Sequence, residues 1–459
     1  MLSQRVFVFE YIFVLYFGLQ IFFPYQFTTF STLAIFSLLS LIKYKFEGFR
    51  IPYLFILFSQ LVLLVTTHGY AFLPLGALLF FIIGYFPVYK YPEPTGPYKV
   101  GYKKIELPDS QNVAVFYPTN ETTKDVKYSP SSENWERFAD VTRLFSMMKK
   151  KSPMPKFIFK YTFHYLEHHY LGVNEDATII KLDNKDNNKG FPVIIFSHGL
   201  SANVNMYSIQ LKEWASNGFI VFSVDHEEQI YLSLKAFQDY MEIRKSQLIY
   251  RKQTIIKVLD FVYNNLFIKK LFGNQEIFIN RQKVFLAGHS FGGATVSEVS
   301  VHDKRVTGGL VLLDPWFEPC NERIYNEEIS KPLLSIRSNQ YDKMKITRDF
   351  TMKHAETNIK NGSGLSGFFK DTNHNASTDL RILMYREMAL LSSKKERDDV
   401  RSQIIYQTQL IKAFLKVVLE HDESSEAENE EQTIKSKVLK VYREDMKRHG
   451  IKDVLQVDE

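Results

Sequence analysis

Two patterns of apolar positions follow one another along the chain and meet near residue 90. Before that point, four almost uninterrupted apolar stretches are separated by short connections. Each stretch approaches the roughly 20 residues with which an α-helix crosses a bilayer. A helix packed on a soluble core would need a polar face, and these stretches have almost none. The pattern predicts an all-helical, multi-span membrane region over residues 1–90. Its four transmembrane helices are expected at residues 6–23, 27–42, 52–66 and 70–89.

Basic residues are unevenly shared among the ends and connections of these stretches. Arg5 precedes the first stretch, Lys43, Lys45 and Arg50 separate the second from the third, and Lys90 follows the fourth. The other two connections carry no Lys or Arg. Because cytoplasmic loops are enriched in these residues, we predict an integral multi-pass membrane protein whose remaining domain lies in the cytosol.

After residue 94 the pattern becomes one of short apolar runs that alternate with amphipathic segments. Such alternation predicts an α/β domain over residues 94–419, with a mostly parallel central sheet covered by helices on both faces. Strands are expected at residues 112–117, 191–197, 219–224, 284–287, 309–313 and 332–337. Helices are expected at residues 207–217, 236–265 and 407–419, and directly after Ser290. Residues 420–459 are predicted to be a charged tail, with a flexible acidic linker and then a short helix.

Composition narrows the possible functions. The formal net charge of +6 comes from scattered Lys and Arg, which suits contact with anionic lipid, and no nucleic-acid-binding motif is present. Cys320 is the single cysteine, so no disulfide can form within the chain. His164, His168 and His169 lack the His-Glu-x-x-His order of zinc hydrolases. We therefore expect neither nucleic acid nor a metal among the partners.

The strongest chemical signal is Gly-His-Ser-Phe-Gly at residues 288–292, between a predicted strand and a predicted helix. In that context, Gly-x-Ser-x-Gly is typical of the nucleophile elbow of the α/β-hydrolase fold. The two glycines permit a tight turn that lifts the serine above the sheet. Ser290 is therefore the predicted nucleophile of a serine esterase.

A serine nucleophile needs a base and an acid, which follow it in the order serine, acid, histidine in this fold. His374 is the predicted base, because it lies in a loop after the last predicted strand and before a helix. Asp314 and Asp342 each follow a predicted strand, at the carboxyl edge where sites of parallel sheets form. Position alone leaves these two acids equally possible.

The oxyanion of an acyl-transfer intermediate needs backbone N–H donors. One is expected from Phe291, the residue after the nucleophile. The second is expected from Leu200, because the strand at residues 191–197 leads into His-Gly-Leu. His198 is interpreted as a buttress of this loop and not as the base.

Several segments in the same order resemble the plasma-type platelet-activating-factor acetylhydrolases, calcium-independent sn-2 phospholipases of the α/β-hydrolase superfamily. The resemblance covers residues 94–419 and begins with Pro-Thr-Gly-Pro-Tyr-Lys-Val-Gly at residues 94–101. It is densest at Gly-His-Ser-Phe-Gly-Gly-Ala-Thr-Val, residues 288–296. Leu-Asp-Pro-Trp at 313–316 and His-Asn-Ala-Ser-Thr-Asp at 374–379 match the acid and base motifs, although the family's own acid motif has Ala where Pro315 stands.

The resemblance implies Asp314 as the acid, and Leu200 and Phe291 as the oxyanion donors. It also implies hydrolysis of an acetyl or short acyl ester at the sn-2 position of glycerophospholipids, without a cofactor. Four N-terminal spans differ from the signal peptide of secreted members, so a membrane bilayer is the expected setting. Two alternatives stay open: a carboxylesterase for small soluble esters, and a non-catalytic membrane scaffold with a degenerate hydrolase domain.

Overall fold

The structure is a computed structural model, and it describes most of the chain beyond residue 91. The described residues are 92–107, 111–128, 170–182, 190–200, 202–226, 240–321, 324, 327, 329–370, 372–379, 382, 394–421, 433–448 and 453–458. Within them, no helix combines the length and apolar character that a membrane crossing requires. The four predicted transmembrane helices lie in residues 1–90, outside the described residues.

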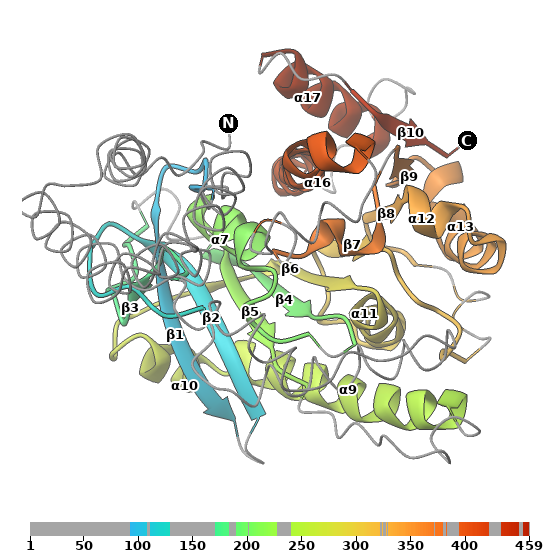
Figure 1. Cartoon of the computed structure of the whole chain (residues 1–459). Helices are drawn as coiled ribbons and strands as arrows, with labels where there is room; N and C mark the ends of the chain where they lie inside the picture. Colours follow the sequence, from blue (N-terminus) through green and yellow to red (C-terminus); the bar gives the residue numbers. More distant parts are fainter. Residues whose placement is uncertain are drawn as a thin grey trace, which may run out of the picture.

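One mixed sheet forms the centre of the described part (Figure 1). Its ten strands have the order β10-β9-β8-β7-β6-β4-β5-β2-β1-β3. The bounds are β1 Lys99–Leu107, β2 Gln111–Thr119, β3 Asn174–Glu175, β4 Phe191–Ser197, β5 Ile220–Val224, β6 Ile279–His289, β7 Gly309–Leu313, β8 Leu333–Ser338, β9 Gly364–Phe369 and β10 Leu455–Val457. Strands β4 to β9 run parallel, whereas β1, β2 and β10 pair antiparallel with β2, β5 and β9.

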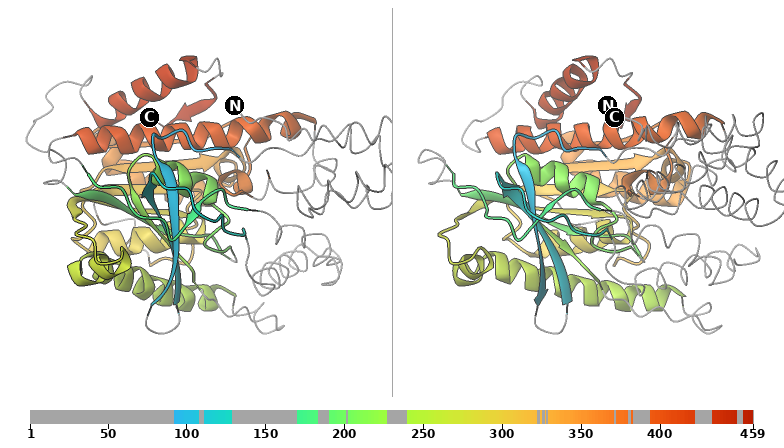
Figure 2. Two further views of the ribbon diagram at one scale, coloured as in Figure 1. Left: turned by 90° about the vertical axis from the view of Figure 1, so that its left-hand side faces the viewer. Right: turned by 60° about the vertical axis from the view of Figure 1, so that its left-hand side comes forward.

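Helices cover both faces of this sheet, and Figure 2 shows them as separate layers. One layer contains α7 (Ser208–Ser216), α16 (Lys394–Glu420) and α17 (Ile434–Arg448). The opposite layer contains α9 (Tyr240–Val262), α10 (Asn265–Leu271) and α11 (Phe291–His302). Helices α12 (Asn339–Asp342) and α13 (Lys345–Lys360) follow β8.

The central strands are buried on both faces, which explains why they are continuous apolar runs in the sequence. Successive side chains of a strand point to opposite faces. Thus Ile194 and Phe196 of β4 enter the core beneath α7 and α16, whereas Val193 and Ile195 enter the core beneath α9 and α11. Strands β6 and β7 divide their side chains in the same way. The predicted α/β architecture is therefore present.

Two predicted elements differ in the structure. The helix expected at residues 236–265 is α9 and ends earlier, at Val262, because Asn264 is extended and its side chain accepts hydrogen bonds from the N–H groups of Leu266 and Phe267. That is an N-cap, so α10 is a separate helix. The predicted C-terminal tail contributes α17, which packs on α16, and β10, which extends the sheet beside β9.

Candidate active site

Three loops carry the predicted catalytic side chains to one edge of the sheet. Because β6, β7 and β9 are parallel neighbours or near neighbours, the loops after them leave the sheet at the same edge. Ser290 follows β6, Asp314 follows β7, and His374 lies in a short 3₁₀ turn at His374–Ser377, beyond β9. The structure therefore brings together residues that are up to 84 positions apart in the chain.

Ser290 occupies a strained turn between β6 and α11. Its φ of 57° and ψ of −120° are rare for a residue with a side chain, and such strain is stored where a functional group has to be exposed. A Cβ atom at Gly292 would collide with the carbonyl of Ser197, so only glycine allows α11 to approach β4 this closely. The elbow predicted from the sequence is therefore present in the backbone.

Hydrogen bonds join the three side chains in a line. The Ser290 Oγ lies 3.1 Å from Nε2 of His374, and Nδ1 of His374 lies 3.0 Å from Oδ2 of Asp314. The second oxygen of Asp314 accepts the backbone N–H of Ser338 at 2.5 Å. Asp314 is 2 % exposed and His374 has a quarter of its side chain exposed. A carboxylate in this position holds the imidazole with its Nδ1 protonated, so Nε2 can accept the serine proton.

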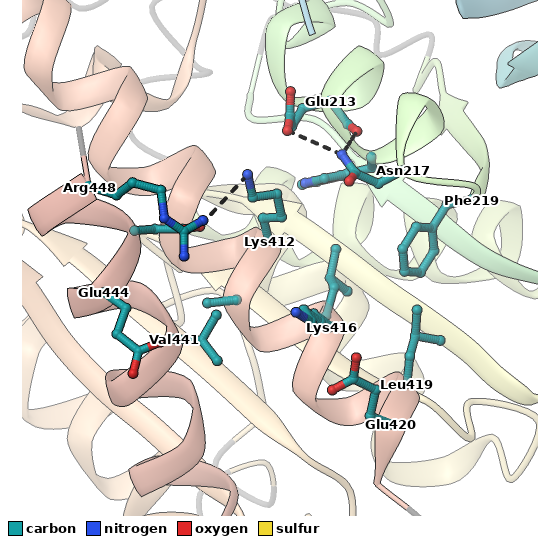
Figure 3. A pocket seen from close by; sticks show the side chains of 14 residues that line it. Glu213, Asn217, Phe219, Lys412, Lys416, Leu419, Glu420, Val441, Glu444 and Arg448 are labelled. Atoms are coloured by element: carbon teal, nitrogen blue, oxygen red, sulfur yellow. Dashed lines mark hydrogen bonds and ion pairs between the residues drawn. The ribbon is translucent and has the colours of Figure 1, made fainter. Parts of the chain in front are cut away.

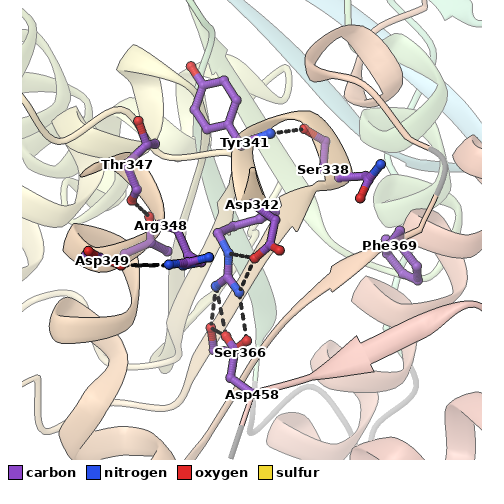
Figure 4. Close-up of polar contacts among 12 residues, drawn as sticks. Ser338, Tyr341, Asp342, Thr347, Arg348, Asp349, Ser366, Phe369 and Asp458 are labelled. Carbon is purple, nitrogen blue, oxygen red and sulfur yellow. Dashed lines mark hydrogen bonds and ion pairs between the residues drawn. The ribbon is translucent and has the colours of Figure 1, made fainter. Parts of the chain in front are cut away.

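The alternative acid, Asp342, has other partners. It lies in α12, and its Oδ1 accepts hydrogen bonds from Nε and Nη2 of Arg337, both at 3.1 Å. Figure 4 shows this cluster, which also includes Ser366 and Asp458. Asp342 is therefore engaged with a buried cation and is not beside the imidazole.

The loop that carries Leu200 lies against the elbow. A Cβ atom placed on Gly199 would be 3.4 Å from Cβ of Ser290, so His-Gly-Leu and Ser290 are immediate neighbours. Within the described part of the chain, neither the Leu200 nor the Phe291 N–H donates to a protein acceptor. Two such N–H groups beside a serine are what an oxyanion requires.

His198 holds this loop. Its Nδ1 donates to the carbonyl of Gly199 at 2.7 Å, and its Nε2 accepts the N–H of His226 at 3.0 Å. In a trans peptide the C=O and N–H point in opposite directions. Anchoring the Gly199 carbonyl on His198 therefore turns the Leu200 N–H away from that ring. The interpretation of His198 as a buttress agrees with these contacts.

Asp379 anchors the end of the loop that carries His374 to helix α7. This buried carboxylate accepts the N–H and Oγ–H of Ser208 and the N–H of Ile209, at the start of α7. Negative charge at a helix N-terminus is stabilising. The short loop from His374 to Asp379 is thus held to the helix layer.

Sequence reasoning missed two aromatic neighbours of the predicted base. Tyr341 of α12 stacks on His374, with 4.3 Å between the ring centroids and 4° between the planes. The ring of His289 lies 4.5 Å from that of His374. The position of His289 beside Ser290 was a possible signal, whereas the stacking of Tyr341 depends on how α12 packs.

His289, Asp314 and His374 are also the one group of potential metal ligands found within the described residues. Their hydrogen bonds engage them with one another and with Ser290. His164, His168 and His169 lie outside the described residues.

A separate cavity of about 540 Å³ lies between α7, α16 and α17 (Figure 3). Its lining mixes acidic and basic side chains, among them Glu213, Lys412, Glu444 and Arg448, and includes none of the residues around Ser290. The predicted nucleophile and base lie at Ser290 and not in this cavity.

The strand order, the parallel centre and the elbow define an α/β-hydrolase fold. The chain belongs to the platelet-activating factor acetylhydrolase family: the model of "Platelet-activating factor acetylhydrolase, isoform II" matches residues 83–253 and 227–438.

Curated relatives carry the same name. The chain is 32 % identical to platelet-activating factor acetylhydrolase of Cavia porcellus over 190 residues, which are 34 % of this chain and 42 % of that protein. It is 23 % identical to the Gallus gallus protein over 302 residues, 55 % of this chain and 66 % of the relative. The Bos taurus protein is 32 % identical over 182 residues, 33 % of this chain and 40 % of the relative. The matches thus span between two fifths and two thirds of these relatives.

Among solved structures, a ferulic acid esterase from Streptomyces cinnamoneus has a TM-score of 0.48 and 15 % sequence identity. That likeness covers 75 % of this chain and 97 % of the esterase chain.

Proposed function

We propose that the chain is a carboxylic ester hydrolase with Ser290 as nucleophile, His374 as base and Asp314 as acid. The observation that carries the proposal is the pair of hydrogen bonds from Ser290 Oγ through His374 to Asp314, at 3.1 and 3.0 Å, on a strained elbow. A serine with a purely structural role has no need of a backbone held at positive φ, as that of Ser290 is.

The reaction follows from the positions of these atoms. Nε2 of His374 takes the Ser290 proton while Oγ attacks the ester carbonyl, and Asp314 stabilises the imidazolium that forms. The N–H groups of Leu200 and Phe291 receive the developing oxyanion. His374 then gives its proton to the leaving alkoxide, and water hydrolyses the acyl-serine by the same steps in reverse.

For the substrate, we propose the sn-2 acetyl or short acyl ester of a glycerophospholipid, which would release a lysophospholipid. Support comes from the family and from the name of the relatives, platelet-activating factor acetylhydrolase. We also propose that residues 1–90 keep the domain at a membrane, where such lipids are found; resistance of the full-length chain to extraction by alkaline carbonate would support this.

The decisive experiment compares the full-length chain with Ser290→Ala. Hydrolysis should be followed on phosphatidylcholines of graded sn-2 length and on p-nitrophenyl acetate. The variant should lose at least about a thousandfold in kcat, because removal of a nucleophile leaves only the contribution of binding and the oxyanion hole. Wild-type turnover in Ser290→Ala would refute the mechanism.

The same experiment separates the alternatives. Cleavage of p-nitrophenyl acetate without cleavage of any phosphatidylcholine would indicate a carboxylesterase for small esters. A wild-type chain that neither turns over nor reacts at Ser290 with a fluorophosphonate would indicate a non-catalytic scaffold.

A further inference from the structure

A buried chain of hydrogen bonds connects the oxyanion loop to the base loop behind Ser290. It begins at Gly199, whose N–H lies 3.0 Å from Oη of Tyr207. Oη of Tyr207 lies 2.9 Å from Nδ1 of His289, and Nε2 of His289 lies 3.0 Å from the carbonyl oxygen of His374. Tyr207 and His289 are 1 % and 3 % exposed, so water does not compete for these bonds.

The donor and the acceptor of each hydrogen bond in this series can be assigned. The His374 carbonyl can only accept, so Nε2 of His289 carries a hydrogen. Burial, and next the charge that His374 can carry, hold the pKa of His289 well below its usual range, so its ring is neutral. Nδ1 is therefore a bare acceptor and receives the O–H of Tyr207. Oη of Tyr207 in turn accepts the N–H of Gly199.

Packing leaves little freedom to replace these contacts. A Cβ atom at Gly199 would lie 3.0 Å from both His289 Nδ1 and Tyr207 Oη, so the loop needs glycine to reach them. The ring of Tyr207 lies 4.8 Å from Phe196 and 5.5 Å from His289. Both side chains are thus fixed in place by neighbouring rings.

We propose that Tyr207 and His289 are positioning residues, which hold the Leu200 N–H and the His374 imidazole in register with the nucleophile between them. The series of hydrogen bonds starts at Gly199, the residue before Leu200, and ends at His374. His289, in its middle, directly precedes Ser290 in the sequence. A displacement of about 1 Å of either group can cost about 100-fold in rate. This inference rests on the proposed function.

The test uses the full-length chain with p-nitrophenyl acetate as substrate, and active sites are counted by fluorophosphonate titration so that only folded molecules enter kcat. Tyr207→Phe and His289→Phe each keep an aromatic ring at the position and interrupt the series of hydrogen bonds. Each should lower kcat by about 10- to 100-fold with little change in KM, because both loops act chiefly on the transition state. The double variant should lose no more than about threefold beyond the poorer single variant, since both changes break one connection.

Rescue and matched controls separate positioning from a general loss of stability. His289→Gln should recover part of kcat, because an amide can accept at oxygen and donate at nitrogen. Tyr117 of β2 has a buried O–H that donates to the Ala177 carbonyl at 2.7 Å. Tyr117→Phe removes this bond and should lower Tm without a change in kcat. His354, in α13, is another buried histidine, so His354→Phe is the matched control for His289→Phe and should leave kcat unchanged.

Wild-type kcat in Tyr207→Phe or His289→Phe would overturn the inference, as would independent effects that multiply in the double variant. Either result would leave the proposed function intact, provided that Ser290→Ala is inactive. Full activity of Ser290→Ala would instead refute the proposed function and the inference with it.

Discussion

At the scale of single residues, two carboxylates follow adjacent strands of the sheet and have different hydrogen-bond partners. Asp314, after β7, pairs with His374 at 3.0 Å, whereas Asp342, after β8, pairs with Arg337 at 3.1 Å. Asp314 also has a positive φ of 44°, as the proposed nucleophile Ser290 does at 57°. The different partners therefore support Asp314 as the group that orients the base.

Replacement of each acid by its amide tests whether Asp314, and not Asp342, orients the base. Asp314→Asn should lower kcat by about 10⁴-fold, because an amide favours the wrong tautomer of the imidazole. Asp342→Asn, the matched control, should change kcat by less than about fivefold, since its loss affects Arg337 and leaves His374 in place. Steady-state kinetics on p-nitrophenyl acetate measures both. A larger loss in Asp342→Asn than in Asp314→Asn would assign the acid to Asp342.

The sequence alone could not have separated these two acids. Both stand at the carboxyl end of a buried strand, and nothing local distinguishes them. The fold decides the partners that separate them: His374 lies 60 positions from Asp314 in the chain, and Arg337 reaches Asp342 because α12 packs against β8. By contrast, Ser290 was predictable because its turn, its glycines and its strand are all local. The resemblance to the acetylhydrolase family supplied the choice that position could not.

At the scale of elements, the C-terminal strand is tied to the rest of the sheet by a buried ion pair (Figure 4). Arg337 of β8 is fully buried, and its Nη1 and Nη2 donate to the two oxygens of Asp458 at 2.8 and 2.7 Å. Its Nη1 also donates to Ser366 of β9 at 3.1 Å. Arg337 therefore connects β8, β9 and the segment after β10, next to Ser338 and the start of α12.

Asp458→Asn should consequently destabilise the fold. Breaking a buried ion pair typically costs about 3–5 kcal/mol, and Asp342, which still faces Arg337, should reduce this to about 2 kcal/mol. Denaturant unfolding measures the change. Asp349→Asn is the matched control, because its pair with Arg348 is exposed and contributes little. Equal stability of the two variants would mean that the Arg337–Asp458 pair adds nothing to the stability of the fold.

At the scale of the whole molecule, the sequence predicted the centre of the sheet better than its edges. Strands β4 to β8 are buried on both faces and are therefore continuous apolar runs, which are easy to recognise. The strands at and next to the edges are weaker signals: β1 carries charged residues along its length, β9 is rich in small residues, and β10 has three residues. Although β1 pairs with β2, which follows it directly, β10 pairs with β9 from beyond α16 and α17, so its own three residues could not predict the pairing.

Buried histidines make the stability of the whole fold depend on pH. His226, His289 and His354 are each at most 5 % exposed, and burial lowers the pKa of each, for His354 to about 3. When the chain unfolds, these rings return to a pKa of about 6.5 and take up protons. Below that pH the unfolded state binds more protons than the folded state, so the free energy of unfolding must fall as the pH falls.

His354→Phe tests this dependence at one position. The imidazole stacks on Phe317 at 4.6 Å, and neither ring nitrogen has a hydrogen-bond partner within the described residues, so phenylalanine should be accommodated. Between about pH 6 and pH 5, the wild-type free energy of unfolding should carry a contribution of about 1.4 kcal/mol per pH unit from this residue. The variant should lose that part of the slope and gain stability at acid pH. His302→Phe, at an exposed position at the end of α11, is the control for the same replacement at the surface. Parallel pH profiles of the wild type and His354→Phe would show that this imidazole has the same pKa in the folded and the unfolded protein, and would contradict the prediction.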